Sequence, residues 1–241
     1  MKRFPAKTGP YPIRLVFETD EIDDMCSEEL HKANLLPAKP EAIRIERFVE
    51  KSFTKEVGFE ELPPGCMGYT AFGKDGSILA VRVSSRIAED ETVAAERRVR
   101  STWAHEAGHC LLHPSLFIEE ATLGLGEIQN ATTALKERRF LCRAGDIQPV
   151  THDGFKKYDG RWWEWQANRA IGGFLLPKPL VLQAAEPFLK RSLVTGSPLL
   201  PAAARSDAEK NLADIFDVNP VAVRIRLQEM FPDRDLSQIE F

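Results

Sequence analysis

The sequence predicts an α+β domain in which a small twisted β-sheet lies beside two helices that bring metal ligands together. Three observations on the 241-residue chain predict this class. Residues 67–83 show a strand–turn–strand pattern, and a His-Glu-x-x-His motif at residues 105–109 lies within a helical pattern. A second helical pattern begins at residue 162 and carries Glu164 in its first turn. The two helices can therefore offer histidine and carboxylate side chains to one site.

The composition is that of a soluble globular protein, with 43% hydrophobic and 28% charged residues. A net charge of −4 gives no general attraction to nucleic acid or to an anionic membrane, and we expect neither as a partner. The first residues lead into no apolar run typical of a signal peptide, and no segment is long and apolar enough to span a bilayer. We therefore expect a cytoplasmic protein whose four cysteines are free thiols.

Three segments are predicted along the chain. Residues 1–40 are rich in proline and are expected to form an extended N-terminal arm. Residues 41–204 form the predicted central domain, in which residues 115–160 are an insertion or loop region. Residues 205–241 hold a pair of helices that we expect to pack on the central domain.

The N-terminal half carries the predicted sheet. A short edge strand is expected within the arm at residues 13–17, followed by an acidic helix over residues 20–32, and a further helical period begins at residue 41 and ends near Gly58. Two more strands flank the turn signal Asp75-Gly76. The second of them, residues 77–83, is expected at the sheet edge, where an extended peptide can pair with it.

The motif helix follows a charged stretch and ends at His113-Pro114, because the residue before a proline is disfavoured in helical conformation. Residues four apart share a helix face, so His105 and His109 can offer two imidazoles to one cation. Glu106 is placed to take a proton from a metal-bound water. The alternative is a helix that carries two histidines without a metal, and a third ligand decides between them.

Two further residues near this motif carry side chains that can bind metals. His113 continues the four-residue spacing, but it lies about 12 Å along a straight helix from the first ligand, so we assign it a role at the helix C-terminus. Cys110 follows His109 directly and is expected to point away from the ligand face. A zinc role for Cys110 or Cys142 stays open.

The second helix, from residue 162 to Pro177, supplies the third ligand. Glu164 can complete a His, His, Glu set with an open fourth position, as in catalytic zinc sites. Asn168 lies one turn later and can hydrogen-bond a ligand imidazole and fix its tautomer. The alternative for Glu164 is a solvated carboxylate favoured by the helix dipole, but the flanking tryptophans indicate a partly buried position.

The C-terminal part is predicted to contain helix fragments and two longer helices. Ser206 is expected to cap the first, which runs to Phe216, and Asn219-Pro220 begins the second, which runs to Met230. Basic residues around these helices are matched by acidic ones, whereas a DNA-recognition helix shows a basic excess.

These motifs resemble the ImmA/IrrE-type metallopeptidases. The likeness lies in residues 97–109, residues 164–177 and residues 212–227, within a span of roughly 41–231. The resemblance implies a zincin-like, gluzincin-type zinc endopeptidase of bacteria, phages or mobile elements. Members of this family often cleave, or regulate by binding, a repressor of the helix-turn-helix type. The sequence departs from the family in its long 115–160 region, and no separate DNA-binding domain precedes the peptidase part.

Carried over residue by residue, the resemblance implies that His105, His109 and Glu164 hold one zinc ion per chain and that Glu106 is the general base. We therefore predict metal-assisted hydrolysis of a peptide bond. The metal content of the purified protein is the first measurement that tests this prediction. Three residues that lie shortly before the third ligand are candidate donors for the developing oxyanion: His152, Tyr158 and Arg161.

Two alternatives come from other functional classes. One is a catalytically silent, metal-containing regulator that acts by binding a partner, although pure binding gives no role to Glu106. The other is a DNA-binding regulator that uses the C-terminal helix pair.

Overall fold

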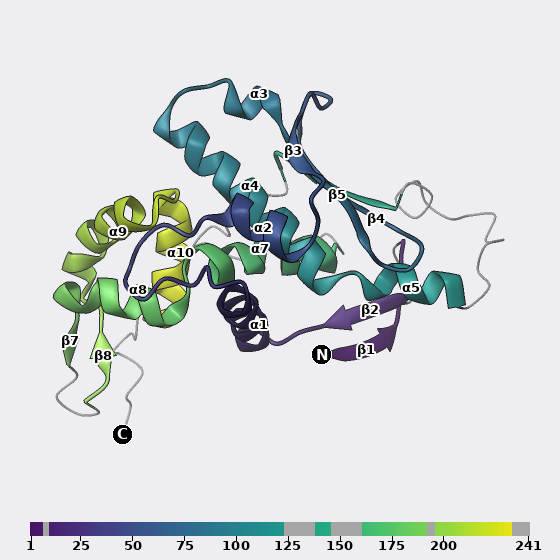
Figure 1. Ribbon diagram of the computed structural model, residues 1–241. Coiled ribbons are helices and arrows are strands. Elements are labelled where there is room, and N and C mark those ends of the chain that lie inside the picture. Colours follow the sequence, from purple (N-terminus) through teal and green to yellow (C-terminus); the bar gives the residue numbers. More distant parts are fainter. Residues whose placement is uncertain (7–9, 123–137, 146–160, 192–195, 233–241) are drawn as a thin grey trace.

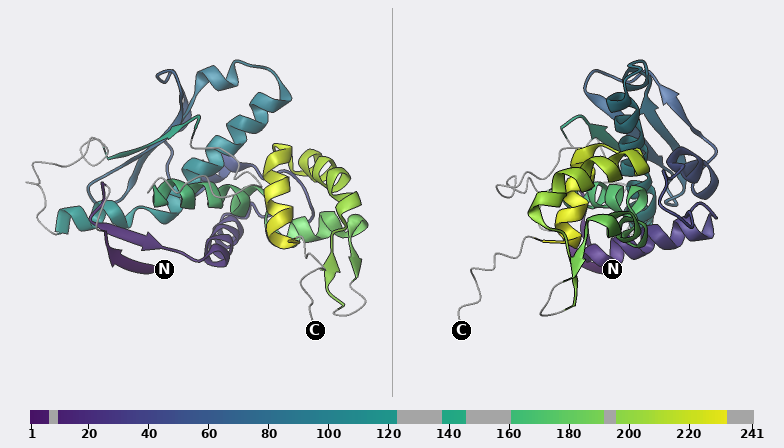
Figure 2. Two further views of the ribbon diagram at one scale, coloured as in Figure 1. Left: turned by 180° about the vertical axis from the view of Figure 1, so that it is seen from behind. Right: turned by 90° about the vertical axis from the view of Figure 1, so that its left-hand side faces the viewer.

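Helix α4 (Val93–Leu112) is the central element, with the main sheet on one side and α7 (Trp162–Leu175) and then α1 (Thr19–Lys32) on the other (Figure 1). The computed structural model describes residues 1–6, 10–122, 138–145, 161–191 and 196–232. Two further views show the C-terminal helices together at one end of this stack (Figure 2). The fold is therefore mixed α+β, as predicted, and the motif helix lies in its interior.

The main sheet has four strands in the order β3-β5-β4-β6 among the described residues. The strands are β3 (Val57–Glu60), β4 (Cys66–Phe72), β5 (Ile78–Ser84) and β6 (Arg139–Arg143). β3 pairs with β5 in parallel, and the other pairs are antiparallel. The predicted strand–turn–strand unit is confirmed, with Gly76 at a φ of +77° in its turn.

The predicted edge position of residues 77–83 is wrong. β5 has a neighbour on both sides, because β3 pairs with it in parallel and β4 pairs with it in antiparallel orientation. The apolar run that identified this strand reflects burial: Val81 and Val83 are fully buried. Among the described strands, β3 and β6 are the edges of this sheet.

The N-terminal residues are more structured than an extended arm. β1 (Lys2–Pro5) and β2 (Ile13–Val16) form an antiparallel hairpin, and the acidic helix predicted at residues 20–32 is confirmed as α1. α1 packs against α7 so closely that a Cβ at Gly173 would lie 2.8 Å from Cys26 Sγ. The arm expected over residues 1–40 is thus corrected, because α1 buries an apolar face in the core.

Three shorter helices flank the motif helix: α2 (Ile45–Ser52), α3 (Ser85–Ala88) and α5 (Ser115–Thr122). α2 ends before the predicted position near Gly58, where β3 has already begun. At the start of α4, the Thr92 hydroxyl accepts a hydrogen bond from the Ala95 amide at 3.2 Å. The predicted end of α4 before Pro114 is confirmed, with His113 as its C-cap.

Gly108 sets the distance between the two ligand helices. A Cβ at this position would lie 2.8 Å from the Ala170 Cβ and 3.0 Å from the Ala167 Cα. Any side chain at residue 108 would therefore push α7 away from α4. The small residues on both helices allow α7 to approach the motif closely.

The C-terminal region contains helices and one small sheet. Its elements are α8 (Lys178–Ala185), η2 (Glu186–Phe188), β7 (Lys190–Arg191), β8 (Pro198–Leu199), α9 (Ala202–Phe216) and α10 (Pro220–Met230). Asn219 caps α10 as predicted, since its Oδ1 accepts from the Val221 amide at 3.0 Å. The predicted cap at Ser206 is wrong, because helix-favouring alanines extend α9 back to residue 202.

The C-terminal helices contact α4 through polar groups as well as through the shared core. Arg97 Nη2 donates to Asp214 Oδ1 at 2.8 Å, and Arg100 Nε donates to the carbonyl of Asp217 at 2.8 Å. These contacts hold the end of α9 against the first half of the motif helix. The division into segments at residues 40 and 204 stays a prediction.

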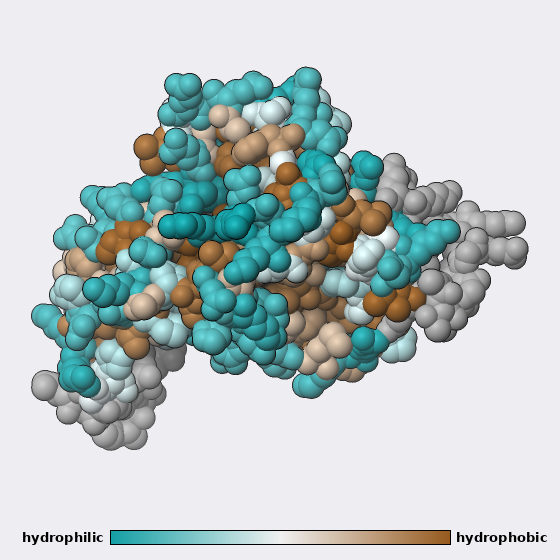
Figure 3. Space-filling model, viewed as in Figure 1, coloured by the Kyte–Doolittle hydropathy of each residue, from teal (hydrophilic) through white to brown (hydrophobic). Residues whose placement is uncertain are grey.

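The surface seen in Figure 3 is largely hydrophilic, and hydrophobic residues appear on it in scattered patches. None of the helices in the described ranges is both long enough and apolar enough to cross a membrane.

Candidate metal centre

Three predicted ligands meet between α4 and α7. His105 and His109 lie one turn apart on α4, and Glu164 lies in the first turn of α7. The two Nε2 atoms are 3.1 Å apart, and Glu164 Oε2 lies 3.2 Å from His105 Nε2 and 3.7 Å from His109 Nε2. Ligand atoms of a tetrahedral zinc ion are about 3.3 Å apart, given metal–ligand distances of about 2.0–2.1 Å. The spacing of the three atoms therefore fits one small metal ion.

All three side chains are buried. The two imidazoles are fully buried, and Glu164 is 6% exposed, which contradicts the alternative of a solvated carboxylate. A buried carboxylate requires a positive partner, because water no longer solvates its charge. Burial raises the pKa of Glu164, but its contacts with His105 and His109 outweigh this effect and lower it overall. The centre thus holds a negative charge in the interior of the protein.

Asn168 sets the tautomer of His105. Its Oδ1 lies 3.0 Å from His105 Nδ1, and an amide oxygen can only accept a hydrogen bond. Nδ1 of His105 therefore carries the proton, and Nε2 directs its lone pair toward Glu164 and His109. The predicted contact between Asn168 and a ligand imidazole is confirmed.

A chain of hydrogen bonds sets the tautomer of His109. Gln166 Nε2 donates to the backbone carbonyl of Leu15 at 2.8 Å, so Gln166 Oε1 faces His113 Nε2, 3.0 Å away. His113 must then donate from Nε2 and accept at Nδ1, which lies 3.0 Å from His109 Nδ1. His109 consequently donates from Nδ1 and presents the lone pair of Nε2 to the centre.

His113 therefore positions the ring of His109, a predicted ligand. The prediction that it is not itself a ligand agrees with this arrangement, but its role goes beyond that of a histidine at a helix end. Burial, reinforced by the nearby His109, lowers the pKa of His113 well below its ordinary range. The neutral ring can accept the proton of His109, as the chain of hydrogen bonds requires.

The lone pairs of two nitrogens and one carboxylate oxygen thus converge on one point. Glu164 Oε2 is buried and has no hydrogen-bond partner among the described residues. Such groups repel one another unless a cation lies between them. The residues present therefore fit a bound metal ion.

Glu106 points from the next position of α4 toward strand β4. The Thr70 hydroxyl donates to its Oε2 at 2.6 Å, and Oε1 is buried without a hydrogen-bond partner in the described part of the chain. A Cβ at Gly68 would lie 2.9 Å from Oε1, so β4 can approach this carboxylate only because residue 68 lacks a side chain. Burial raises the pKa of Glu106 to about 8, although the neighbouring His105 acts in the opposite direction. One oxygen is thus held by Thr70, and the other has no hydrogen-bond partner among the described residues.

Strand β6 brings Cys142 to the same region. Its thiol forms a second possible ligand group with His105 and Glu106, in which the ligand atoms lie within 4.8 Å of one another. Burial raises the pKa of Cys142 to about 11, so the thiol form is favoured, whereas metals bind the thiolate. The set of two imidazoles and Glu164 is therefore the better candidate. Cys110 is buried and belongs to neither of the groups found among the described residues.

Sequence reasoning missed several groups at this centre. Thr70 contacts Glu106, and Gln166 together with the carbonyl of Leu15 supports His109 through His113. Tyr11 lies near Glu164: burial is the main cause that raises the pKa of its phenol, and the charge of Glu164 adds to it. The sequence does contain one indication for Gln166, which is a polar residue within a largely apolar helix. Of the predicted oxyanion donors, Arg161 is the N-cap residue of α7. His152 and Tyr158 lie outside the described residues.

We expect Gln166→Leu to weaken zinc binding about 10- to 100-fold. Without the amide, His113 can carry its proton on Nδ1, and this atom then no longer accepts a hydrogen bond from His109 Nδ1. Competition with a chelating dye measures the affinity. Gln183→Leu is the matched control, since Gln183 is exposed on α8. Equal affinities of the two variants would show that the chain of hydrogen bonds does not support the ligand.

No protein-family model matches the chain, and no curated protein matches it either.

Proposed function

We propose that the protein is a zinc-dependent endopeptidase with a zincin-like, gluzincin-type fold. The observation that carries the proposal is the convergence of three lone pairs on one point, beside a buried carboxylate on the same helix. Two imidazoles and one carboxylate favour zinc among the metals used by peptidases. The mixed sheet packed against the motif helix, with the third ligand on a later helix, supports the zincin-like assignment.

His105, His109 and Glu164 would hold the ion. When bound, zinc supplies a Lewis acid that acidifies water and polarises a carbonyl group. Asn168 and His113 fix the ring orientations, so the imidazoles need no rearrangement to bind. The ion is proposed at one per chain.

Glu106 would move the proton. Its Oε1, which has no partner among the described residues, would accept a proton from the attacking water and return it to the leaving amine, while Thr70 holds Oε2 in place. The enclosed site keeps the carboxylate away from bulk water and favours proton exchange at this position. Arg161 is the candidate oxyanion donor within the described residues.

A peptide substrate fits the edge of the sheet beside the centre. β6 pairs with β4 on one side and is an edge strand among the described strands, and it carries Cys142 next to His105. An extended peptide could pair with β6 through main-chain hydrogen bonds, which demand little of the side chains. We propose a regulatory protein as substrate, of the helix-turn-helix repressor type implied by the motif resemblance to ImmA/IrrE peptidases.

The two alternatives receive less support. A silent binding protein has no use for a buried Glu106, whose burial is unfavourable for its charged form. A DNA-binding role for the C-terminal pair would need available basic groups. Arg224 is instead bound to Glu209 at 2.7 Å and Arg226 to Asp23 at 2.9 Å.

Metal analysis of the purified 241-residue chain tests the proposal. We expect about one zinc ion per wild-type chain and less than a tenth of that in Glu164→Ala, because two imidazoles alone bind zinc weakly. Glu186→Ala is the control, since Glu186 is exposed and lies outside the centre. A wild-type protein that takes up no metal after zinc is supplied would refute the peptidase proposal.

A further inference from the structure

A cavity is lined by residues of α4, α7 and α10, and none of the three predicted metal ligands lines it. Its volume is about 380 Å³, within the range of small-molecule sites. Asn168 borders it, and the same residue contacts His105. The catalytic arrangement proposed above gives this cavity no role.

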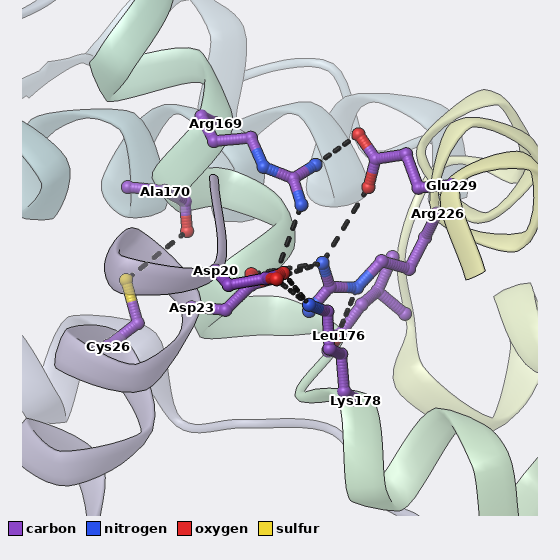
Figure 4. A network of polar contacts seen from close by, with 9 residues as sticks. All are labelled: Asp20, Asp23, Cys26, Arg169, Ala170, Leu176, Lys178, Arg226 and Glu229. Atoms are coloured by element: carbon purple, nitrogen blue, oxygen red, sulfur yellow. Dashed lines mark hydrogen bonds and ion pairs between the residues drawn. The ribbon is translucent and has the colours of Figure 1, made fainter. Parts of the chain in front are cut away.

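Three arginines line the cavity: Arg98 from α4, Arg169 from α7 and Arg226 from α10. Arg226 is 1% exposed, and its Nη1 lies 2.9 Å from Asp23 Oδ1 (Figure 4). Arg169 Nη2 lies 3.2 Å from Asp23 Oδ2, and Nη1 of Arg169 is bound to Glu229. These pairs fix both guanidinium groups at the cavity wall.

Some donors of these groups are still without acceptors. Arg226 Nη2 and Arg169 Nε are buried and have no hydrogen-bond partner among the described residues. A buried guanidinium group that is incompletely paired favours negative charge nearby. Both arginines line the cavity, so its wall favours an anion.

The charged groups around the cavity also favour an anion. In the network of Figure 4, the carboxylates of Asp20, Asp23 and Glu229 match the cations Arg169, Lys178 and Arg226. Arg98 adds a further positive charge, and its exposed side chain makes no ion pair with any described residue. The network and Arg98 together therefore carry an excess of one positive charge.

Apolar and aromatic side chains also line the cavity. Trp165 is 46% exposed there, whereas Trp103, Trp162 and Trp163 are each at most 9% exposed. Ile225 of α10 also lines the cavity. An exposed indole beside aliphatic groups offers a surface on which a flat ring can stack.

We propose that this cavity binds a small organic anion, in which a flat ring carries a phosphate or a carboxylate group. The ring packs on Trp165 and Ile225, and the anionic group lies near the exposed Arg98, in the field of the guanidinium groups of Arg169 and Arg226. The proposal is independent of peptidase activity, because none of these residues holds the metal or moves the substrate proton.

Isothermal titration calorimetry of the full chain with phenyl phosphate and with benzoate tests the proposal. We expect at least one of the two to bind, and the tighter one identifies the preferred anionic group. Benzyl alcohol, which has the ring without the charge, should bind at least about 10-fold more weakly, because the arginines gain nothing from it. Failure of both anions to bind at about 10 mM, or equal binding of benzyl alcohol, would overturn the proposal.

Two variants at the cavity rim locate the binding. We expect Arg98→Gln and Trp165→Ala each to weaken binding of the preferred anion about 10-fold, because one removes the excess charge and the other removes the stacking surface. Arg44→Gln and Leu182→Ala are matched controls, since both residues are exposed elsewhere. All four changes are at exposed positions and leave the core intact. Binding that is equal in all four variants would place the anion elsewhere and refute the assignment.

Discussion

Glu106→Gln is expected to reduce peptide hydrolysis by about 10²- to 10⁴-fold while the metal content stays at the wild-type level. The amide is nearly isosteric with the carboxylate, and it still accepts from the Thr70 hydroxyl through its oxygen. It cannot take a proton from water or return one to a leaving amine. The loss should therefore appear in kcat, with little change in substrate binding.

Cleavage of denatured casein or of a quenched fluorescent peptide library measures this effect in zinc-loaded protein. Glu96→Gln is the control, because Glu96 is exposed in the first turn of the same helix. A Glu106→Gln protein that cleaves as fast as the Glu96→Gln protein would exclude Glu106 as the proton-transfer group. Wild-type protein that holds zinc but cleaves no peptide would favour the silent regulatory alternative.

Asp23→Ala is expected to lower the free energy of unfolding by about 3–5 kcal/mol, because removal of one partner leaves the other charges buried without compensation. Asp23 is 4% exposed and contacts Arg226 through both oxygens, at 2.9 Å and 3.0 Å. The network joins α1, α7, α8 and α10, so its loss should loosen the C-terminal pair from the core (Figure 4). For a chain of this size the melting temperature should fall by roughly 6–20 °C.

Urea unfolding measures the difference in stability, with Asp24→Ala as the control at an exposed position one residue along α1. A change of less than about 1 kcal/mol in Asp23→Ala would show that the network is replaceable by apolar packing.

The same network predicts how stability depends on acid. Burial raises the pKa of Asp23, but the ion pairs with Arg226 and Lys178 outweigh this effect and hold it below its ordinary value. A carboxyl whose pKa is lowered by folding stabilises the protein above its unfolded pKa of about 3.9, and that contribution is lost as the pH falls through the folded pKa. Wild type should therefore lose more stability than Asp23→Ala on acidification below pH 4.

Periodicity and spacing were sufficient to predict the elements that carry the centre. The four-residue spacing of His105 and His109 specifies a shared helix face without reference to the rest of the chain. Glu164 was recognised by its place at the start of an apolar helix, where an unpartnered charge is unfavourable. Both inferences depend on local geometry, which the sequence encodes directly.

The errors arose where the answer depends on distant partners. The position of β5 within the sheet depends on β3, a four-residue strand whose short run gives little signal of its own. His113 was judged by its distance from His105, but its function depends on Gln166, 53 residues later. The cavity at α10 likewise joins three helices that are far apart in sequence, and no single segment indicates it.

The carbonyl of Leu15, which accepts from Gln166, makes a contribution to the centre that no side chain encodes. Every amino acid has this group, so a change of residue type at position 15 leaves the acceptor in place as long as β2 keeps its register. A one-residue insertion or deletion in β2 is different, because successive carbonyls along a strand point in opposite directions. In β2, natural variation would thus be constrained in chain length more than in amino-acid identity. A shift of register would remove the acceptor of Gln166 and should lower metal affinity, even if every residue type were kept.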